Sequence, residues 1–155
     1  MTNLPTPTWR PPQQIRAKVI GLAWRGDAVL AVEVLDDRGR VKGVRPPGGS
    51  IEFGETREQA LEREFREELG CGVTITGPWA VFENLYRHEG ALGHEILFAA
   101  PVRLHDAALY DRDAIAFAED SGTPCTARWF RPEALPEGVA LYPDGLAAAL
   151  AARTR

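Results

Sequence analysis

The sequence predicts an α/β domain, because one clearly amphipathic helix stands between two groups of strand-like segments. The helix is expected over residues 56–69, and an alanine-rich segment at 145–153 predicts a second helix near the C-terminus. The chain has 155 residues, of which 45% are hydrophobic and 26% are charged. That composition is enough for one hydrophobic core, so we expect a single domain over residues 15–155.

Three strands are expected before the helix. Residues 1–14 contain four prolines, which fix φ and remove a backbone donor, so they predict an extended N-terminal arm. After the arm, runs of alternating or β-branched residues separated by glycine- and aspartate-containing turns predict strands at 15–24, 28–35 and 41–45. The Pro-Pro-Gly-Gly run at 46–49 ends the last of them.

The expected helix has sequence signals at both of its ends. Thr56 and Gln59 have the spacing of a capping box, in which each side chain satisfies a backbone amide of the other. Gly70 has the position of a helix-ending glycine. Between the two ends, apolar residues recur at every fourth position and predict one buried stripe: Leu61, Phe65 and Leu69.

The second half of the chain predicts a further set of strands. Strand-like composition occurs at 73–75, 79–85 and 95–102, with a turn expected at 90–93, and again at 126–130. Residues 106–122 have no clear period, and we expect them to form loops in part.

Bulk properties exclude some classes of protein. The net charge of −4 is unlike that of a non-specific nucleic-acid binder, which needs a basic face. No apolar run is long enough to span a bilayer, and residues 1–14 do not form a signal peptide, so we expect a cytoplasmic protein. Cys71 and Cys125 do not make a disulfide framework and are expected to be reduced.

Three carboxylates on the expected helix suggest a metal site. Glu64, Glu67 and Glu68 stand at i, i+3 and i+4, so they share one face beside the apolar stripe. Like charges repel more strongly where the effective dielectric is low, and a divalent cation would relieve that repulsion. Carboxylates without thiolates select a hard ion, Mg²⁺ or Mn²⁺, and Mg²⁺ also binds substrate phosphates.

A glycine-rich loop precedes the acidic helix. Glycines at 48, 49 and 54 allow the backbone to turn tightly and to approach a ligand closely. Alone, such glycines indicate a plain turn and an acidic helix indicates a solvated face. Their combination, with Arg63 and Glu55 in register, favours a functional site.

The segment from Gly49 to Cys71 resembles the Nudix box. That box has Gly, five residues, Glu, seven residues, Arg-Glu-apolar-x-Glu-Glu-x-Gly and an apolar residue, and each fixed position is matched here, with Cys71 as a small apolar residue at the end. The box covers 23 of the 155 residues. Flanking segments at 45–49, 128–130 and 132–135 also resemble the family.

The resemblance implies an α/β/α sandwich with a mixed β-sheet, in which the box forms a loop–helix–loop catalytic motif. It implies that Glu67 and Glu68 bind Mg²⁺, with Gly49 beside them, and that Glu64 is a metal ligand or base. It also implies that Arg63 pairs with Glu55 and orients the helix, a supporting role. Mn²⁺ is a possible substitute for Mg²⁺.

The implied reaction is attack of water on a phosphorus of a nucleoside diphosphate linked to another group. Nucleoside triphosphates, nucleotide sugars and dinucleoside polyphosphates all fit that description, and the substrate is a small molecule rather than a membrane or a nucleic acid. The alternatives are a non-catalytic nucleotide-sensing module, which typically loses one of the three box glutamates, and a related isomerase of isoprenoid diphosphates. A homodimer is possible, and the N-terminal arm is a plausible exchange element.

Residues outside the box are expected to select the substrate. Arg45 can bind phosphate through its guanidinium, while Tyr86 and His94 are candidates for contacts to the nucleotide. Some family members use a further acid well beyond the box. Here the candidates for that distal acid are Glu119 and the adjacent Asp120, with two more acids on expected strands as further options: Glu83 and Glu95.

Overall fold

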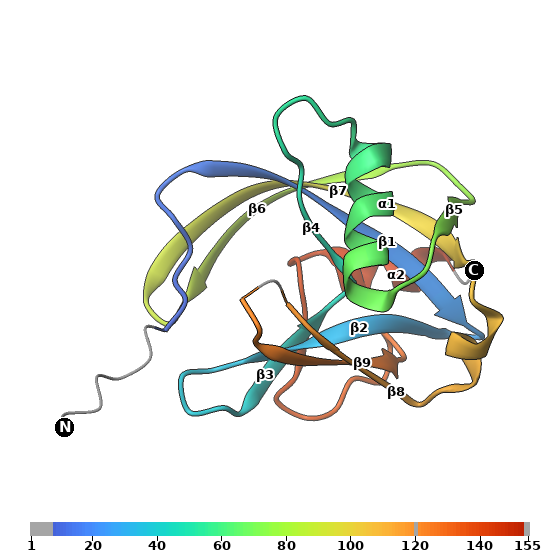
Figure 1. Cartoon of the computed structure of the whole chain (residues 1–155). Helices are drawn as coiled ribbons and strands as arrows, with labels where there is room; N and C mark the ends of the chain where they lie inside the picture. Colours follow the sequence, from blue (N-terminus) through green and yellow to red (C-terminus); the bar gives the residue numbers. More distant parts are fainter. Residues whose placement is uncertain (1–7, 120, 154–155) are drawn as a thin grey trace, which may run out of the picture.

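The computed structural model describes residues 8–119 and 121–153 (Figure 1). The described residues form ten strands, two α-helices and one short 3₁₀ helix. In chain order these are β1 (Ile15–Arg25), β2 (Ala28–Leu35), β3 (Val41–Arg45), β4 (Gly48–Ser50), α1 (Arg57–Leu69), β5 (Val73–Ile75), β6 (Ala80–His88), β7 (Ala91–Leu104), η1 (Ala107–Asp111), β8 (Ala114–Ala118), β9 (Pro124–Phe130), β10 (Ala140–Leu141) and α2 (Leu146–Arg153).

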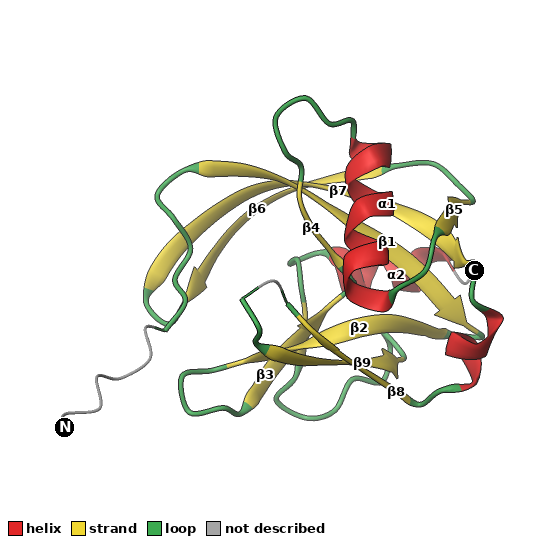
Figure 2. Ribbon diagram, viewed as in Figure 1, coloured by secondary structure: helices red, strands yellow, loops and turns green. Residues whose placement is uncertain are grey.

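The strands build one strongly curled mixed sheet with two lobes (Figure 2). In the first lobe, β1 runs parallel to β7, β4 lies antiparallel on the other edge of β1, and β6 and β5 lie antiparallel to β7. The second lobe has β2 between β3 and β9, with β10 and β8 outside them. The end of β1 turns into β2 and so joins the two lobes.

The two α-helices cover opposite faces of this sheet. Along β1, Val19 packs in a core cluster with Leu61 and Phe65 of α1, while its neighbour Ile20 packs in a second cluster with Leu146 of α2. Adjacent strand residues point to opposite faces, so the sheet lies between the helices. The expected α/β/α sandwich with a mixed sheet is therefore confirmed.

Helix α1 has the ends that its sequence predicts. The Thr56 side chain accepts from the Gln59 amide, and the Gln59 side chain accepts from the Thr56 amide, which completes the capping box. Gly70 ends the helix in the left-handed conformation, with φ 69°. Leu61 and Phe65 are fully buried, so the helix is anchored firmly on the sheet by its apolar stripe.

Two predictions about the strands need correction. The turn expected at 90–93 is instead the two-residue loop Glu89-Gly90, so β6 and β7 extend to His88 and from Ala91. Part of the glycine loop forms β4, because Gly48–Ser50 pairs with β1. The segment 106–122 does form loops in part, as expected, and its ordered parts are η1 and β8, which pairs with β9.

Only part of the expected N-terminal arm, residues 8–14, is described. Arg10 forms an ion pair with Asp37 in the β2–β3 turn, and the Trp9 ring lies 5.4 Å from the His88 ring at the end of β6. These residues therefore lie along the tips of two hairpins of the same chain. Neither α1 nor α2 has the length and apolar character required to cross a bilayer, and the described part of the chain holds no other α-helix.

Candidate active site

Arg63 is the centre of a charged network on α1. Its Nε and Nη2 atoms donate to the two carboxylate oxygens of Glu55, at 2.7 and 2.9 Å. Hydrogen bonding to Arg63 lowers the pKa of Glu55 to about 2 and raises the pKa of Arg63 above its ordinary value. The pair expected from the box spacing is thus present, and both groups are charged across the range of pH in which proteins work.

The remaining donors of Arg63 bind the loop and two other glutamates. Nη2 also donates to the carbonyl of Ser50 at 3.0 Å, which ties the helix to the end of β4. Nη1 lies 2.9 Å from Oε1 of Glu64 and 3.3 Å from Oε2 of Glu67. One guanidinium therefore fixes the positions of the loop and of two carboxylates, because its donors form a rigid planar fork.

The carboxylate of Glu64 lies directly against the backbone of Gly49. A Cβ at position 49 would collide with the Glu64 carboxyl group, so only glycine leaves this carboxylate in place. The side chain of Glu64 is 14% exposed. Burial raises its pKa, against the opposing effect of Arg63. The close approach of a glycine to a carboxylate is therefore the physical reason for a glycine at this end of the box.

Glu68 is the most strongly perturbed carboxyl group of the trio. Burial raises its pKa to about 8, although the positive charge of Arg45 acts in the opposite direction. Its Oε2 atom is buried and has no hydrogen-bond partner. A buried carboxylate oxygen without a donor is unfavourable, so this atom is suited to receive a proton or a cation.

These observations fit a divalent cation at the acidic edge of α1. The donors are carboxylate oxygens, Glu68 has an unsatisfied buried oxygen, and Gly49 brings a backbone segment against Glu64. Within the described residues, no three His, Cys, Asp or Glu side chains converge as a ready-made metal cage. Magnesium usually keeps several waters and uses one or two protein carboxylates together with substrate phosphates, so it does not require such a cage.

The loop between β8 and β9 brings another acid into this region. Glu119 is among the charges that raise the pKa of Glu68, and it also interacts with the thiol of Cys125. Burial, followed by the charge of Glu119, raises the pKa of Cys125 to about 11. The expected distal acid Glu119 thus lies within electrostatic range of Glu68, while the other candidate, Asp120, lies outside the described residues.

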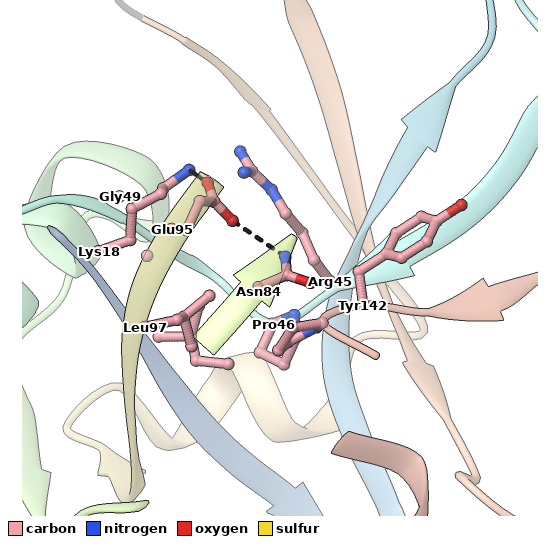
Figure 3. A pocket seen from close by; sticks show the side chains of 11 residues that line it. Lys18, Arg45, Pro46, Gly49, Asn84, Glu95, Leu97 and Tyr142 are labelled. Atoms are coloured by element: carbon pink, nitrogen blue, oxygen red, sulfur yellow. Dashed lines mark hydrogen bonds and ion pairs between the residues drawn. The ribbon is translucent and has the colours of Figure 1, made fainter. Parts of the chain in front are cut away.

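A pocket adjoins the carboxylates at Gly49 (Figure 3). It lies between the two lobes of the sheet, and Arg45, the expected phosphate ligand, is part of its wall. Figure 3 shows Lys18 and Glu95 pointing toward one another and Asn84 beside them. The lining residues are Lys18, Ile20, Arg45, Pro46, Gly48, Gly49, Asn84, Glu95, Leu97, Tyr142 and Pro143.

The two other expected nucleotide ligands lie elsewhere. Tyr86 is on the same face of β6 as Asn84, but its hydroxyl group contacts Arg16, 3.1 Å away, and does not line the pocket. His94 was expected near a loop and is instead within β7, next to Glu95, so it points to the opposite face of the sheet. Glu83 lies 3.9 Å from His94 on that opposite face.

Sequence patterns did not identify Lys18 and Asn84, and they placed Glu95 only among optional acids. Each of the three residues is buried in a strand, and each comes from a different strand of the first lobe. The sequence feature that could have pointed to these residues is a charged or polar residue within an apolar strand, such as Lys18 in the run from Ala17 to Leu22. Such a residue points to a site only when a partner is known, and here the partners are far apart in sequence.

Comparison with known proteins identifies the family. The model of the NUDIX domain matches residues 14–149 of the chain, so the chain belongs to the Nudix hydrolase family. The nucleoside triphosphatase NudI of Enterobacter sp. (strain 638) is 40% identical over 73 residues, and that of Escherichia coli O139:H28 (strain E24377A / ETEC) is 38% identical. Each alignment covers 45% of this chain and 52% of the relative, so the chain spans about half the length of these curated relatives.

Solved structures agree with this fold. The solution structure of the E. coli ORF135 protein has a TM-score of 0.53 at 21% identity and covers 91% of this chain and 89% of its own. The MutT Nudix hydrolase from Burkholderia pseudomallei has a TM-score of 0.51 at 19% identity, and the match covers 90% of this chain and 98% of that one. At these identities the likeness shows the fold alone.

Proposed function

We propose that this protein is a metal-dependent hydrolase that cleaves the diphosphate bridge of a nucleoside diphosphate linked to another group. The observation that carries the proposal is the arrangement around Arg63, which holds Glu64 against Gly49 and leaves the buried oxygen of Glu68 free to bind a cation. Nucleoside triphosphates are the first substrates to test, because the relatives from Enterobacter and E. coli are named nucleoside triphosphatases.

Glu64, Glu67 and Glu68 would hold the cation, with Gly49 contributing its backbone. A bound Mg²⁺ supplies charge neutralisation at the phosphate and lowers the pKa of a bound water. Arg63 keeps the carboxylates in position, a role that in other metal sites typically changes affinity or activity 10- to about 100-fold. Glu55, which is held by two hydrogen bonds, keeps Arg63 from rotating away from the carboxylates.

The protein also has to bind the substrate and accept a proton. Arg45 would bind a phosphate from the pocket side, since a guanidinium binds phosphate oxygens through two parallel hydrogen bonds. Attack of water forms one P–O bond and breaks the bridging P–O bond, and a carboxylate accepts the proton of the water. Glu119 is our candidate for that acceptor, because it lies beside the site on a loop between β8 and β9.

The test is the release of phosphate, measured with coupled pyrophosphatase and phosphatase, from a panel of nucleotides. The panel holds nucleoside triphosphates, nucleotide sugars and dinucleoside polyphosphates, each with Mg²⁺, with Mn²⁺ and with a chelator. Turnover of one class that disappears with the chelator is the expected result. Folded protein that binds Mg²⁺ and nucleotides but hydrolyses none of them would contradict the proposal and favour a nucleotide-sensing module.

A further inference from the structure

The floor of the pocket in Figure 3 is a buried polar cluster that the proposed hydrolysis does not use. Lys18 of β1, Asn84 of β6 and Glu95 of β7 are only 5 to 7% exposed. Oε2 of Glu95 lies 3.4 Å from Nζ of Lys18 and 3.1 Å from Nη2 of Arg16. Charged groups this deeply buried cost free energy even when they are paired, so a cluster of them at a pocket needs an explanation.

The cluster fixes the orientation of the Asn84 amide. Nδ2 of Asn84 lies 3.2 Å from Oε1 of Glu95. An ionised carboxylate only accepts hydrogen bonds, so the amide nitrogen must face Glu95 and the amide oxygen must face the other way. Figure 3 shows the oxygen of Asn84 on the side of Arg45. The carboxylate of Glu95 is paired with Arg16 and Lys18, and it therefore holds Asn84 with an acceptor toward the pocket.

The chemistry of the pocket floor suits a flat, neutral ring better than a phosphate. Lys18 is paired with Glu95, so the floor presents the neutral acceptor of Asn84 rather than a free cation. A phosphate carries no donor for that oxygen at neutral pH. Apart from Arg45, the walls around it are largely apolar or aromatic: Ile20, Pro46, Leu97 and Tyr142. A few oriented polar groups among apolar walls are typical of sites that bind small ring systems.

The position of the pocket agrees with a nucleotide lying across it. Gly49 is shared between the pocket and the carboxylate of Glu64, so the pocket begins where the proposed phosphate site ends. Arg45 lines the same pocket, and its positive charge lowers the pKa of Glu68. A nucleotide whose phosphates lie at Glu64 and Glu68 would therefore have its base within reach of the floor.

We propose that Asn84, oriented by Glu95, selects the nucleobase of the substrate by accepting a hydrogen bond from a ring or amino N–H. This inference rests on the proposed function, because it assigns the base end of the same substrate. Asn84 would contact the base directly, whereas Glu95 is a positioning residue that acts through Asn84. Burying an oriented acceptor penalises a base that presents a carbonyl oxygen there, since two acceptors then face each other.

The test compares nucleotides that differ only in whether one edge of the base presents an amino group or a carbonyl oxygen. CTP and UTP, and ATP and ITP, exchange an amino group for a carbonyl and so invert the donor and acceptor pattern at one edge of the base. The wild-type enzyme is expected to discriminate by about tenfold or more in kcat/KM within at least one pair. Asn84→Ala, which leaves the ion pairs of Glu95 intact, is expected to bring that ratio close to one.

Glu95→Gln tests the orientation itself. A glutamine at 95 no longer forces the amide of Asn84 to face one way, so the discrimination ratio is expected to fall although Asn84 is still present. Glu83→Gln is the matched control, because it makes the same chemical change on the same hairpin but on the opposite face of the sheet, and its ratio is expected to equal that of the wild type. Far-ultraviolet circular dichroism and Tm show which variants are folded.

Binding of nucleosides separates this inference from the proposed function. Cytidine, uridine, adenosine and inosine carry no phosphate, and their affinities are measured by titration calorimetry or by NMR shifts of the Asn84 side-chain amide. Selective binding that is lost in Asn84→Ala supports the inference even if no nucleotide is hydrolysed, in which case the proposed function alone fails. The inference is overturned if folded Asn84→Ala protein keeps the wild-type ratio, or if the wild type neither discriminates between bases nor binds a nucleoside.

Discussion

The guanidinium of Arg63 binds both carboxylate oxygens of Glu55, with donor–acceptor distances of 2.7 and 2.9 Å. Glu55 also accepts a hydrogen bond from the amide of Glu52, at 2.9 Å, so it is held by the loop as well as by the helix. The remaining Arg63 donors reach Glu64 and Glu67. The geometry of the proposed metal ligands therefore depends on a residue that would not touch the metal.

Replacing Glu55 by glutamine should lower activity while the protein stays folded. The glutamine can bind Arg63 through one oxygen only, so the guanidinium is free to turn and the carboxylates lose a fixed partner. We expect kcat/KM to fall 10- to about 100-fold, as for other residues that support metal ligands. Glu52→Gln is the control, because Glu52 is more exposed and lies 3.9 Å from Arg63, and it should change kcat/KM by less than about twofold.

Gly49→Ala should disturb the carboxylate of Glu64 directly. The backbone at Gly49 is not in the left-handed region, so alanine is tolerated there by conformation, and the expected effect comes from the collision of its Cβ with Glu64. We expect kcat to fall about tenfold or more, together with a smaller rise in Tm on addition of Mg²⁺. Ser50→Ala, one residue further on, keeps the carbonyl that Arg63 binds and should behave as the wild type. Equal activity of the two variants would show that the contact at Gly49 is unimportant.

The raised pKa of Glu68 predicts how stability depends on pH when metal is removed. The pKa of Glu68 is about 8 in the folded protein and 4.5 as an ordinary glutamate, so folding favours the protonated form. Its contribution to stability is present in full below pH 4.5 and is lost as the pH rises toward about 8. In chelator, Tm should therefore decrease over this range, and the decrease should be smaller in Glu68→Gln.

Addition of Mg²⁺ should reverse this trend. The cation binds the ionised carboxylate and competes with the proton, so the rise in Tm on adding Mg²⁺ should be larger at pH 8 than at pH 6. The measurement is a thermal unfolding series at both pH values with and without the metal. A rise in Tm that is the same at both pH values would argue against Glu68 as a ligand.

Cys125 offers an independent probe of the position of Glu119. At pH 8 a thiol with a pKa of 9 is about one tenth ionised, whereas one with the raised pKa of about 11 is about one thousandth ionised, and the thiolate is the reactive form. In a Cys71→Ala background, Cys125 should therefore react with iodoacetamide about 100-fold more slowly than an ordinary thiol. Glu119→Gln should accelerate the reaction severalfold, while Glu137→Gln, a change at an exposed residue after β9 that is not among the charges acting on Cys125, should not. An unchanged rate in Glu119→Gln would place Glu119 away from this site.

The parts of the fold that depend on neighbouring residues were predictable from the sequence. Thr56, Gln59 and Gly70 mark the ends of α1 by local hydrogen bonds, and the structure contains each of them. The β6–β7 turn was misplaced because it is formed by Glu89 and Gly90, both with positive φ, and glutamate does not signal that conformation. Strands β4 and β8 were missed because only pairing with distant strands makes them strands.

The site likewise has a part that depends on neighbouring residues and a part that depends on residues far apart in the sequence. The three box glutamates share a helix face, so their spacing alone brings them together. Lys18, Asn84 and Glu95 come from three strands, and no local period relates them. His94 was assigned to a loop and is turned away from the pocket, because the extension of β7 sets the alternation of its side chains.

The most direct test of the proposed function is the turnover of Glu67→Gln compared with that of Glu62→Gln. Both changes remove one negative charge from the same helix, but Glu67 is bound by Arg63 at the proposed metal site and Glu62 is exposed on α1. On the best nucleotide of the panel with Mg²⁺, we expect kcat to fall about 100-fold or more in Glu67→Gln, since the metal contributes several kcal/mol and each 1.4 kcal/mol is about tenfold in rate. Glu62→Gln should retain wild-type turnover. Near-wild-type turnover in folded Glu67→Gln would contradict the assignment of this helix face as the metal site.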